Sequence, residues 1–279
     1  MSLYYAICDA LPLEMLHWNF MKNALLAIFI MAPLFGLIST MIVTGKMSFF
    51  SDALGHSAFT GIAIGAICGI AAPTWVAVIF SVVFALLFSL VRSRSNQTAD
   101  TLIGVFSSAA VALGIFIATF DGGSFTKYNQ YLIGDILSVT PAEIGMLLLV
   151  LLATGVFWIV ASNRLTLCAI HPQLASSRGM SVKATQTVFT VAIAVIVTLA
   201  ISWVGLLILN SLLVLPGAAA RNVAKNLRQY HICSVLAALI SGIVGLCLSY
   251  CLGTSTGAAI SLVLAVLFVI SFLFRKVKA

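Results

Sequence analysis

The sequence predicts an all-α polytopic membrane protein with eight or nine transmembrane helices. Hydrophobic residues make up 62% of the 279-residue chain and charged residues only 8%, whereas soluble domains contain roughly 45 to 50% and about 25%. The apolar residues form continuous runs, such as 24–43 and 144–160, and not the short alternating segments of a β-barrel. At about 20 residues per span, the chain has room for a single transmembrane domain over residues 1–279 and for no separate soluble domain.

Nine windows of the chain are apolar enough to be helical spans when charges, Gly and Pro are taken as their boundaries. They cover residues 20–44, 49–71, 74–91, 101–120, 142–161, 184–203, 205–220, 231–251 and 257–274. Residues 1–18 come before the first window and are expected to form an external or interfacial segment that carries Trp18. The seventh window is the shortest, and Pro216 and Gly217 interrupt it. If this window does not cross the membrane, every segment before it lies on the opposite side of the membrane from the one assigned here.

The basic residues predict how the chain is oriented in the membrane. With nine spans, one side holds twelve basic residues: Lys46, Arg92, Arg94, Arg164, Arg178, Lys183, Arg221, Lys225, Arg228, Arg275, Lys276 and Lys278. Only Lys22 and Lys127 lie on the other side. The side rich in Lys and Arg is cytoplasmic by the positive-inside rule, so the C-terminus is expected in the cytoplasm. The net charge of +7 therefore reflects a bilayer environment, and nucleic acid is not expected as a partner.

Two connections between the predicted spans are long. The external stretch 121–141 either is an ordinary loop or dips back into the membrane as a short re-entrant piece, which requires protein or water around it. The cytoplasmic stretch 163–183 is too polar to span. It predicts a short helix from about Pro172 to Arg178, because Pro is favoured at the start of a helix and Gly, here Gly179, just past its end. This helix is either a plain connector or a docking element for another chain.

Asp52 and His56 are the strongest candidates for a functional site. Residues four apart lie one above the other on a helix, so the carboxylate and the imidazole could both reach one cation. Ionisable residues inside a membrane are costly and mark ion pathways more often than structural pairs. A carboxylate oxygen with an imidazole nitrogen suits zinc, manganese or iron(II) and does not choose among them. The same two residues could also relay protons.

Three glycines follow this pair at a spacing of four, namely Gly61, Gly65 and Gly69. Small residues at this spacing allow helices to approach closely. At about 100° per residue, Gly61 lies opposite Asp52. The second span is therefore expected to pack its glycines against a neighbour and to present Asp52 and His56 to a cavity. Pro216 is predicted to shape the packing of the seventh span.

Motifs of enzymes are mostly missing from the sequence. No HExxH is present, and residues 44–48 lack the spacing of a phosphate-binding Walker motif. Residues 253–257 match GxSxG, but they fall in a predicted external loop and not at a strand-to-helix elbow. The chain is therefore not expected to catalyse a covalent reaction, and any ATP would be hydrolysed by a separate chain.

Three segments together resemble the permease subunit of the zinc, manganese and iron family of ATP-binding cassette (ABC) importers. They are residues 45–61 (GKMSFFSDALGHSAFTG), 132–137 (LIGDIL) and 204–221 (VGLLILNSLLVLPGAAAR). The similarity extends from about residue 20 to residue 275. It implies an ABC importer permease-type helix bundle, multi-pass in the bacterial plasma (inner) membrane.

The resemblance also implies partners, a cargo and roles for several residues. Two copies of the chain would form the pore, two cytoplasmic ATP-binding cassette subunits would drive it, and an extracytoplasmic metal-binding protein would deliver the metal. No cofactor would be bound permanently, since zinc, manganese or iron is the cargo. Asp52 and His56, with Asp135 as a weaker candidate, would hold the metal in transit. Leu174, Ala175, Arg178, Gly179 and Met180 would form the coupling helix that docks on the ATPase.

The sequence departs from the family at this last element. The family usually carries an acidic residue ahead of the coupling helix, whereas this chain has His171, Pro172 and Gln173. The docking contacts are therefore expected to differ. Two other functions are weighed against the importer: an ion-coupled secondary transporter that uses Asp52 and His56 as a proton relay, and a membrane scaffold in which the pair is structural. Co-purification with an ATPase distinguishes the importer from both.

Overall fold

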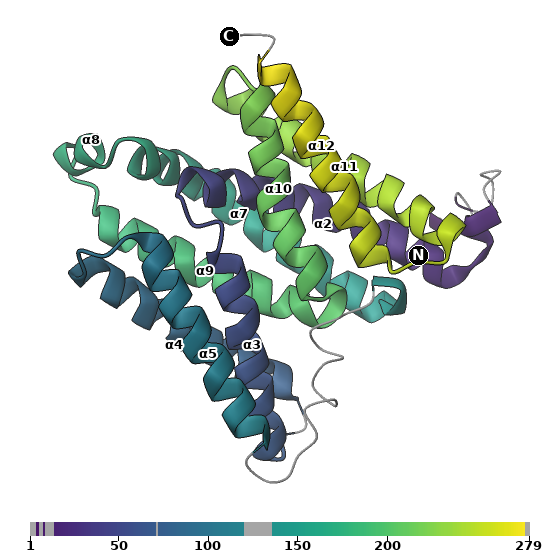
Figure 1. Cartoon of the computed structure of the whole chain (residues 1–279), viewed down its shortest axis with the longest axis horizontal. Coiled ribbons are helices and arrows are strands. Elements are labelled where there is room, and N and C mark those ends of the chain that lie inside the picture. Colours follow the sequence, from purple (N-terminus) through teal and green to yellow (C-terminus); the bar gives the residue numbers. More distant parts are fainter. Residues whose placement is uncertain (1–3, 6–7, 9–13, 71, 120–135, 277–279) are drawn as a thin grey trace. The chain divides into compact units, whose positions relative to one another are not determined.

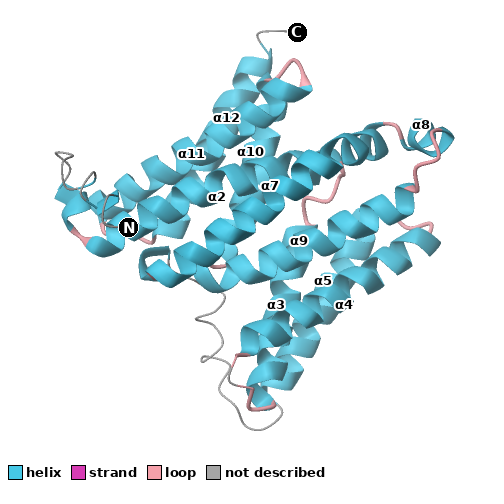
Figure 2. Ribbon diagram, turned by 180° about the vertical axis from the view of Figure 1, so that it is seen from behind, coloured by secondary structure: helices cyan, strands magenta, loops and turns pink. Residues whose placement is uncertain are grey.

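The structure, a computed structural model, describes residues 4–5, 8, 14–70, 72–119 and 136–276 (Figure 1). Within these residues every regular element is a helix, and Figure 2 shows no strand. In chain order the elements are η1 (Glu14–His17), α2 (Asn19–Thr44), α3 (Phe50–Ile67), α4 (Pro73–Arg94), α5 (Ala99–Thr119), η2 (Ile136–Ser138), α7 (Pro141–Ile170), α8 (Pro172–Ser177), α9 (Val182–Val204), α10 (Leu206–Val223), α11 (Leu227–Leu252) and α12 (Thr256–Lys276). The predicted all-α class is confirmed.

Eight helices in the described part of the chain are long and apolar enough to cross a membrane: α2, α4, α5, α7, α9, α10, α11 and α12. The second predicted span, 49–71, is not among them. Its helix α3 has 18 residues, as many as α10, so length does not exclude it. Asp52, His56 and several hydroxyl residues lower its hydropathy. The count therefore falls at the lower of the two predicted values.

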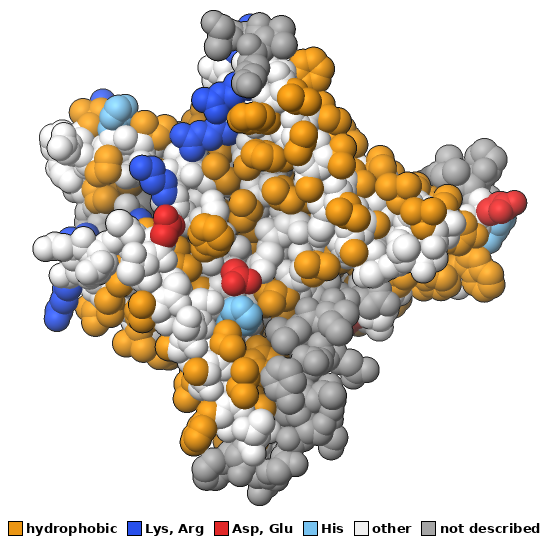
Figure 3. All heavy atoms as spheres, in the orientation of Figure 1, with side chains coloured by type: hydrophobic (Ala, Val, Ile, Leu, Met, Phe, Trp, Pro, Cys, Tyr) orange, Lys and Arg blue, Asp and Glu red, His pale blue; other side chains and the backbone are white. Residues whose placement is uncertain are grey.

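The outer surface of these helices is apolar, as a membrane environment requires. In Figure 3 hydrophobic side chains are spread over the described part of the face, and charged side chains are few. Ile159 and Val160 in α7 are 80% and 73% exposed. Exposed apolar surface on this scale is unfavourable in water but is matched by lipid. The predicted multi-pass membrane protein is confirmed.

Local signals explain where several helices begin and end. Pro73 occupies the first turn of α4, and Arg92 and Arg94 lie in its last turn. The side chain of Ser181 accepts a hydrogen bond from the Ala184 amide at the start of α9. At the start of α11, the Asn226 side chain likewise accepts a hydrogen bond from the Gln229 amide, at 2.8 Å. These caps satisfy amide groups that have no partner inside the helix.

By internal contacts the chain divides into two compact units, which are described separately. The first contains residues 1–40, 135–156 and 211–279. In it α11 and α12 lie side by side (Figure 1), and α2 packs closely on α11. The Ser234 hydroxyl donates to the Gly36 carbonyl at 2.7 Å, and the Tyr230 hydroxyl donates to the Thr40 carbonyl at 3.2 Å.

The second unit contains residues 41–134 and 157–210. At its centre α3 contacts α4, α5 and α9. Two buried polar contacts tie α3 to its neighbours: the hydroxyls of Ser57 and Ser81 are 3.1 Å apart, and the Thr60 hydroxyl donates to the Ala110 carbonyl at 2.7 Å. Because groups buried away from water need a partner, these bonds define which face of α3 is turned inward.

The connection predicted at 163–183 differs from its expected form. α7 continues through the polar residues 163–170 to Ile170, so most of the predicted loop is helix. A helix can run past the hydrocarbon core because its backbone bonds are internal and its polar side chains then meet water. The short helix expected at Pro172–Arg178 is present as α8, and Gly179 follows it with φ +74°. Most of the stretch 121–141 lies outside the described residues, as does most of the segment 1–18.

Candidate functional site

Asp52 and His56 lie on one face of α3 within the second unit. Asp52 is in the first turn of the helix and His56 is one turn later. The His56 Nε2 atom is 3.5 Å from the Asp52 Oδ2 atom, with 28% of the His56 side chain and 49% of the Asp52 side chain exposed. This separation is longer than a good hydrogen bond. The two groups are therefore adjacent and accessible, as ligands to a shared cation need to be.

A third polar residue, Asn210 of α10, completes the arrangement. Its Nδ2 atom donates to the Asp52 Oδ1 atom at 2.9 Å, so the carboxylate has a neighbour at each oxygen. The Oδ1 atom of Asn210 is buried and has no hydrogen-bond partner among the described residues. A buried amide oxygen of this kind is costly.

Reasoning from the sequence did not identify Asn210 as a site residue. The available signal was its position, since it is an amide in the otherwise apolar run 206–210. Polar residues in such runs look for partners on other helices. The partner could not be named, because Asp52 lies 158 positions away in the sequence.

The opposite face of α3 is closed by close helix packing. A Cβ atom added to Gly61 would overlap the backbone of Ala77 in α4, and one added to Gly65 would lie 3.0 Å from the Pro73 Cα atom. Gly55 lies on another face of α3, where it leaves room for Leu206 near the start of α10. The approach of α4 at Gly61 and Gly65 leaves Asp52 and His56 on the side of α3 that faces away from α4.

Gly69 does not share this packing face. α3 ends at Ile67, and Gly69 follows it in a turn with φ +69° and with no atom within 4 Å of a Cβ placed there. The expectation that it packs a helix is therefore corrected. The left-handed backbone that ends the helix favours glycine at this position.

Pro216 lies inside α10 and does not end it. The amide of the next residue, Gly217, donates to the Ser39 hydroxyl of α2 at 2.8 Å, and that hydroxyl lies 3.3 Å from the Val214 carbonyl. Side chains of neighbouring helices commonly satisfy backbone groups near a proline in a membrane helix. The absent side chain of Gly217 also matters, since a Cβ there would lie 2.6 Å from the Ser39 oxygen.

The set of possible metal ligands in one chain is small. The described part of the chain contains no cluster of three or more His, Cys, Asp or Glu side chains that could together hold a metal ion. Asp135, the third predicted ligand, lies outside the described residues. Two side chains, with an amide beside them, make a weaker site than a closed set of four ligands. Such an arrangement suits a metal that stays briefly.

The segment predicted to couple to an ATPase, residues 174–180, is a short helix and turn that are largely exposed. In α8 the Leu174 side chain is 45% exposed, whereas Ala175 is fully buried. The Met180 amide donates to the Ala175 carbonyl at 3.0 Å, which folds the chain back past Gly179. Arg178 and Gly179 are exposed at the end of the helix. The role of these residues in docking stays a prediction.

Comparison with known proteins identifies relatives along almost the whole chain. The model of the ABC 3 transport family matches residues 17–275. An uncharacterised membrane protein of Synechocystis is 31% identical, over 94% of this chain and 93% of its own. The high-affinity zinc uptake system membrane protein ZnuB of Haemophilus influenzae is 28% identical, over 86% and 91%. The manganese transport system membrane protein MntC of Listeria monocytogenes is 26% identical, over 93% and 92%.

A solved structure has the same fold. The chain in the structure of PsaBC from Streptococcus pneumoniae in complex with Fab superimposes with a TM-score of 0.80. The match covers 100% of this chain and 99% of the other, at 24% sequence identity. The chain therefore shares the fold of that protein.

Proposed function

The chain belongs to the ABC 3 transport family, and from this membership we propose that it is the membrane permease of an ATP-driven importer that carries a divalent transition metal into the cytoplasm. Zinc is the first candidate cargo, ahead of manganese and iron. The observation that carries the proposal is the accessible pair of Asp52 and His56 on α3, with Asn210 beside it.

The chemistry of the pair supports transit of a metal ion. Each chain offers one carboxylate oxygen and one imidazole nitrogen, both of which bind zinc. An importer must release what it takes up, so the site must bind weakly enough for the ion to leave. The small number of ligands meets that condition. An imidazole favours zinc over manganese, for which oxygen ligands are more usual.

The proposal includes partners that supply what the chain lacks. A second copy would bring a second Asp52 and His56 and thereby complete the coordination of the ion. ATP-binding cassette subunits would supply the energy from the cytoplasmic side, with α8 as their docking element. A metal-binding protein on the outer side would deliver the cargo.

Metal uptake by cells that depend on this chain tests the proposal. Cells lacking the gene are complemented with the wild-type chain, Asp52→Ala or His56→Ala, and zinc, manganese and iron are measured by mass spectrometry after growth in limiting metal. We expect each substitution to lower accumulation of the transported metal at least tenfold, because each removes one of two ligands. The element whose accumulation falls identifies the cargo.

Controls separate loss of the site from loss of the protein. Asp100→Ala and His17→Ala remove the same groups from exposed positions elsewhere and are expected to leave uptake unchanged at equal expression. Normal accumulation in both site variants would refute the proposal. Uptake that continues without any ATPase partner would favour the ion-coupled transporter.

A further inference from the structure

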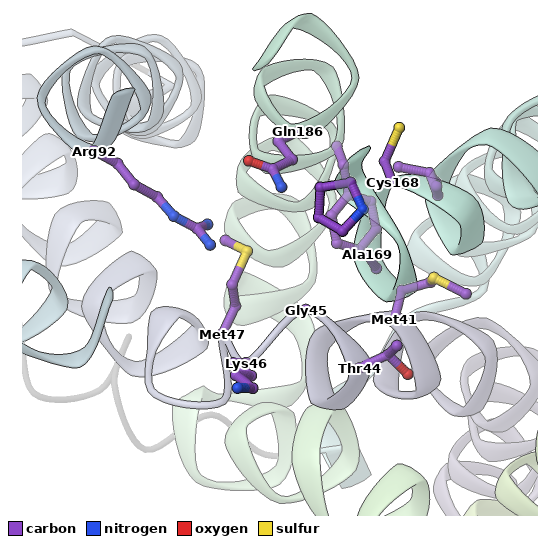
Figure 4. A pocket seen from close by; sticks show the side chains of 12 residues that line it. Met41, Thr44, Gly45, Lys46, Met47, Arg92, Cys168, Ala169 and Gln186 are labelled. Carbon is purple, nitrogen blue, oxygen red and sulfur yellow. The ribbon is translucent and has the colours of Figure 1, made fainter. Parts of the chain in front are cut away.

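A cavity of about 270 Å³ lies in the second unit, separate from the Asp52 site (Figure 4). It is formed by the end of α2, the turn that follows, and parts of α4, α7, α8 and α9. Its apolar wall includes Met41, Met47, Leu165 and Phe189, and its polar groups come from Thr44, Lys46, Arg92 and Gln186. The cavity thus combines an apolar wall with two cationic side chains.

Neither cation is paired with an acid. No Asp or Glu lines the cavity, and among the described residues neither Lys46 nor Arg92 forms an ion pair. In Figure 4 the guanidinium of Arg92 extends toward the space beside Met47, and Gln186 points into the same space. An ammonium or guanidinium group beside apolar surface is favourable only when an anion or water solvates it. The cavity therefore has the electrostatic character of an anion site.

The backbone of Lys46 is a second, independent observation. The Met47 amide donates to the Ile42 carbonyl and the Lys46 amide donates toward the Val43 carbonyl, at 3.0 and 3.3 Å. This is the pattern that closes a helix with a left-handed residue, for which glycine is the usual choice. Lys46 has φ +54°, the only positive φ of a non-glycine residue in the described part of the chain. A lysine here costs stability that a glycine would not, as residues held for a ligand often do.

The cavity also lies at the ends of apolar helices. Arg92 is in the last turn of α4, Lys46 is two residues beyond the end of α2, and Pro172 begins the segment after α7. The ends of membrane-spanning helices lie in the headgroup region of a bilayer, where Lys and Arg side chains attract anionic lipids. A lipid presents a phosphate together with apolar chains, and both parts match the lining of this cavity.

We propose that the cavity between Lys46 and Arg92 binds the phosphate group of an anionic phospholipid. The two cations contact the phosphate, Gln186 and Thr44 supply hydrogen bonds, and the methionine, leucine and phenylalanine side chains contact the glycerol and upper acyl chains. A bound lipid would join the turn that leads into α3 to α4, α7 and α9. The proposal does not depend on the metal cargo.

Native mass spectrometry of the purified full-length chain tests this site. Phosphatidylglycerol, phosphatidylcholine and inorganic phosphate are added separately, and the fraction of chain carrying each adduct is measured for wild type, Arg92→Gln and Lys46→Gly. We expect phosphatidylglycerol to bind the wild type more tightly than phosphatidylcholine does, and each substitution to weaken its binding about fivefold. Arg94→Gln, which removes an exposed arginine from the same turn and does not line the cavity, is the matched control.

The variant Lys46→Gly distinguishes loss of the ligand from loss of the fold. Glycine suits the left-handed backbone, so we expect the melting temperature without added lipid to stay the same or rise while lipid binding weakens. Inorganic phosphate that displaces the lipid, with the same loss in both variants, would support the phosphate site and assign it to a soluble anion. Equal lipid binding by wild type, Arg92→Gln, Lys46→Gly and Arg94→Gln would overturn the proposal.

Discussion

At the scale of single residues, the position of Asn210 is the most informative addition to the predicted site. A carboxylate on a helix surface can rotate, and a metal ligand must keep its oxygen in one place. Asn210 donates to one oxygen of Asp52 at 2.9 Å, and His56 lies beside the other. We therefore regard Asn210 as a positioning residue: it holds the Asp52 carboxylate in one orientation and does not itself bind the metal.

Replacing Asn210 with leucine is expected to raise the metal concentration that gives half-maximal uptake about tenfold. A hydrogen bond to a charged group is worth about 1.5 to 3 kcal/mol, and leucine removes it while keeping a similar volume. The maximal rate should change less, since both predicted ligands remain. Initial uptake rates over a range of metal concentrations separate the two quantities.

Asn222→Leu is the control for this experiment. Asn222 lies on the same helix and donates to the Ser271 hydroxyl at 3.1 Å, so the variant also loses one side-chain hydrogen bond. Identical half-saturation in the Asn210→Leu and Asn222→Leu proteins would show that Asn210 has no positioning role.

At the scale of elements, α3 combines a packed face and an open face. Ser57, Thr60 and Gly61 are directed at α4 and α5, whereas Asp52 and His56 are partly exposed. The small residue at 61 brings the backbones of α3 and α4 together. In lipid, where helices gain little from apolar burial, such close packing is a main source of association.

The substitution Gly61→Ala is expected to lower the free energy of unfolding by about 1 to 3 kcal/mol, the usual cost of overpacking. The new methyl group would overlap the Ala77 backbone, which cannot move aside as a flexible side chain can. The melting temperature of the purified chain in detergent should fall accordingly.

Gly104→Ala in α5 is the matched control, because nothing lies within 4 Å of a Cβ at that helical position. It should melt at the wild-type temperature or slightly above, since alanine is the better helix former. A Gly61→Ala protein as stable as Gly104→Ala would contradict the close approach of α3 and α4.

At the scale of the whole molecule, the chain belongs to a family of transporters and its described surface is largely apolar. The described residues of one chain offer few ligands for a metal, so the proposed function includes partner chains. Under the proposed function, the exposed Leu174 on α8 is a docking contact for the cytoplasmic partner, because an apolar side chain in a polar segment gains from burial.

Truncating this side chain should weaken docking of an ATP-binding cassette subunit without harming the fold. Burial of a leucine contributes about 1.5 to 3 kcal/mol, so Leu174→Ala should reduce affinity for the purified ATPase about tenfold or more. Binding is measured by surface plasmon resonance on the chain in lipid nanodiscs. Gln173→Ala, a neighbouring exposed position, should bind normally. Unchanged affinity of Leu174→Ala would exclude the leucine as a docking contact.

Most helices could be predicted from local patterns, whereas the contacts between distant helices could not. Pro172 and Gly179 indicated α8 because start and stop signals act locally. The seventh span was predicted to continue through Pro216, as α10 does. The partner of the Gly217 amide could not be predicted, since the Ser39 hydroxyl that bonds it comes from α2. α3 is not among the apolar spans because its polar residues lower its mean hydropathy, and the predicted span 49–71 did not take their effect into account.

The sequence by itself determined the class of this protein, its apolar helices and the candidate pair on α3, because hydropathy and a spacing of four are properties of neighbouring residues. Only the tertiary structure decided that Asn210 orders Asp52, that α4 closes the glycine face, and that Lys46 and Arg92 border one cavity. These relations join residues far apart in the chain, and no local pattern encodes which distant side chain will fill a given space.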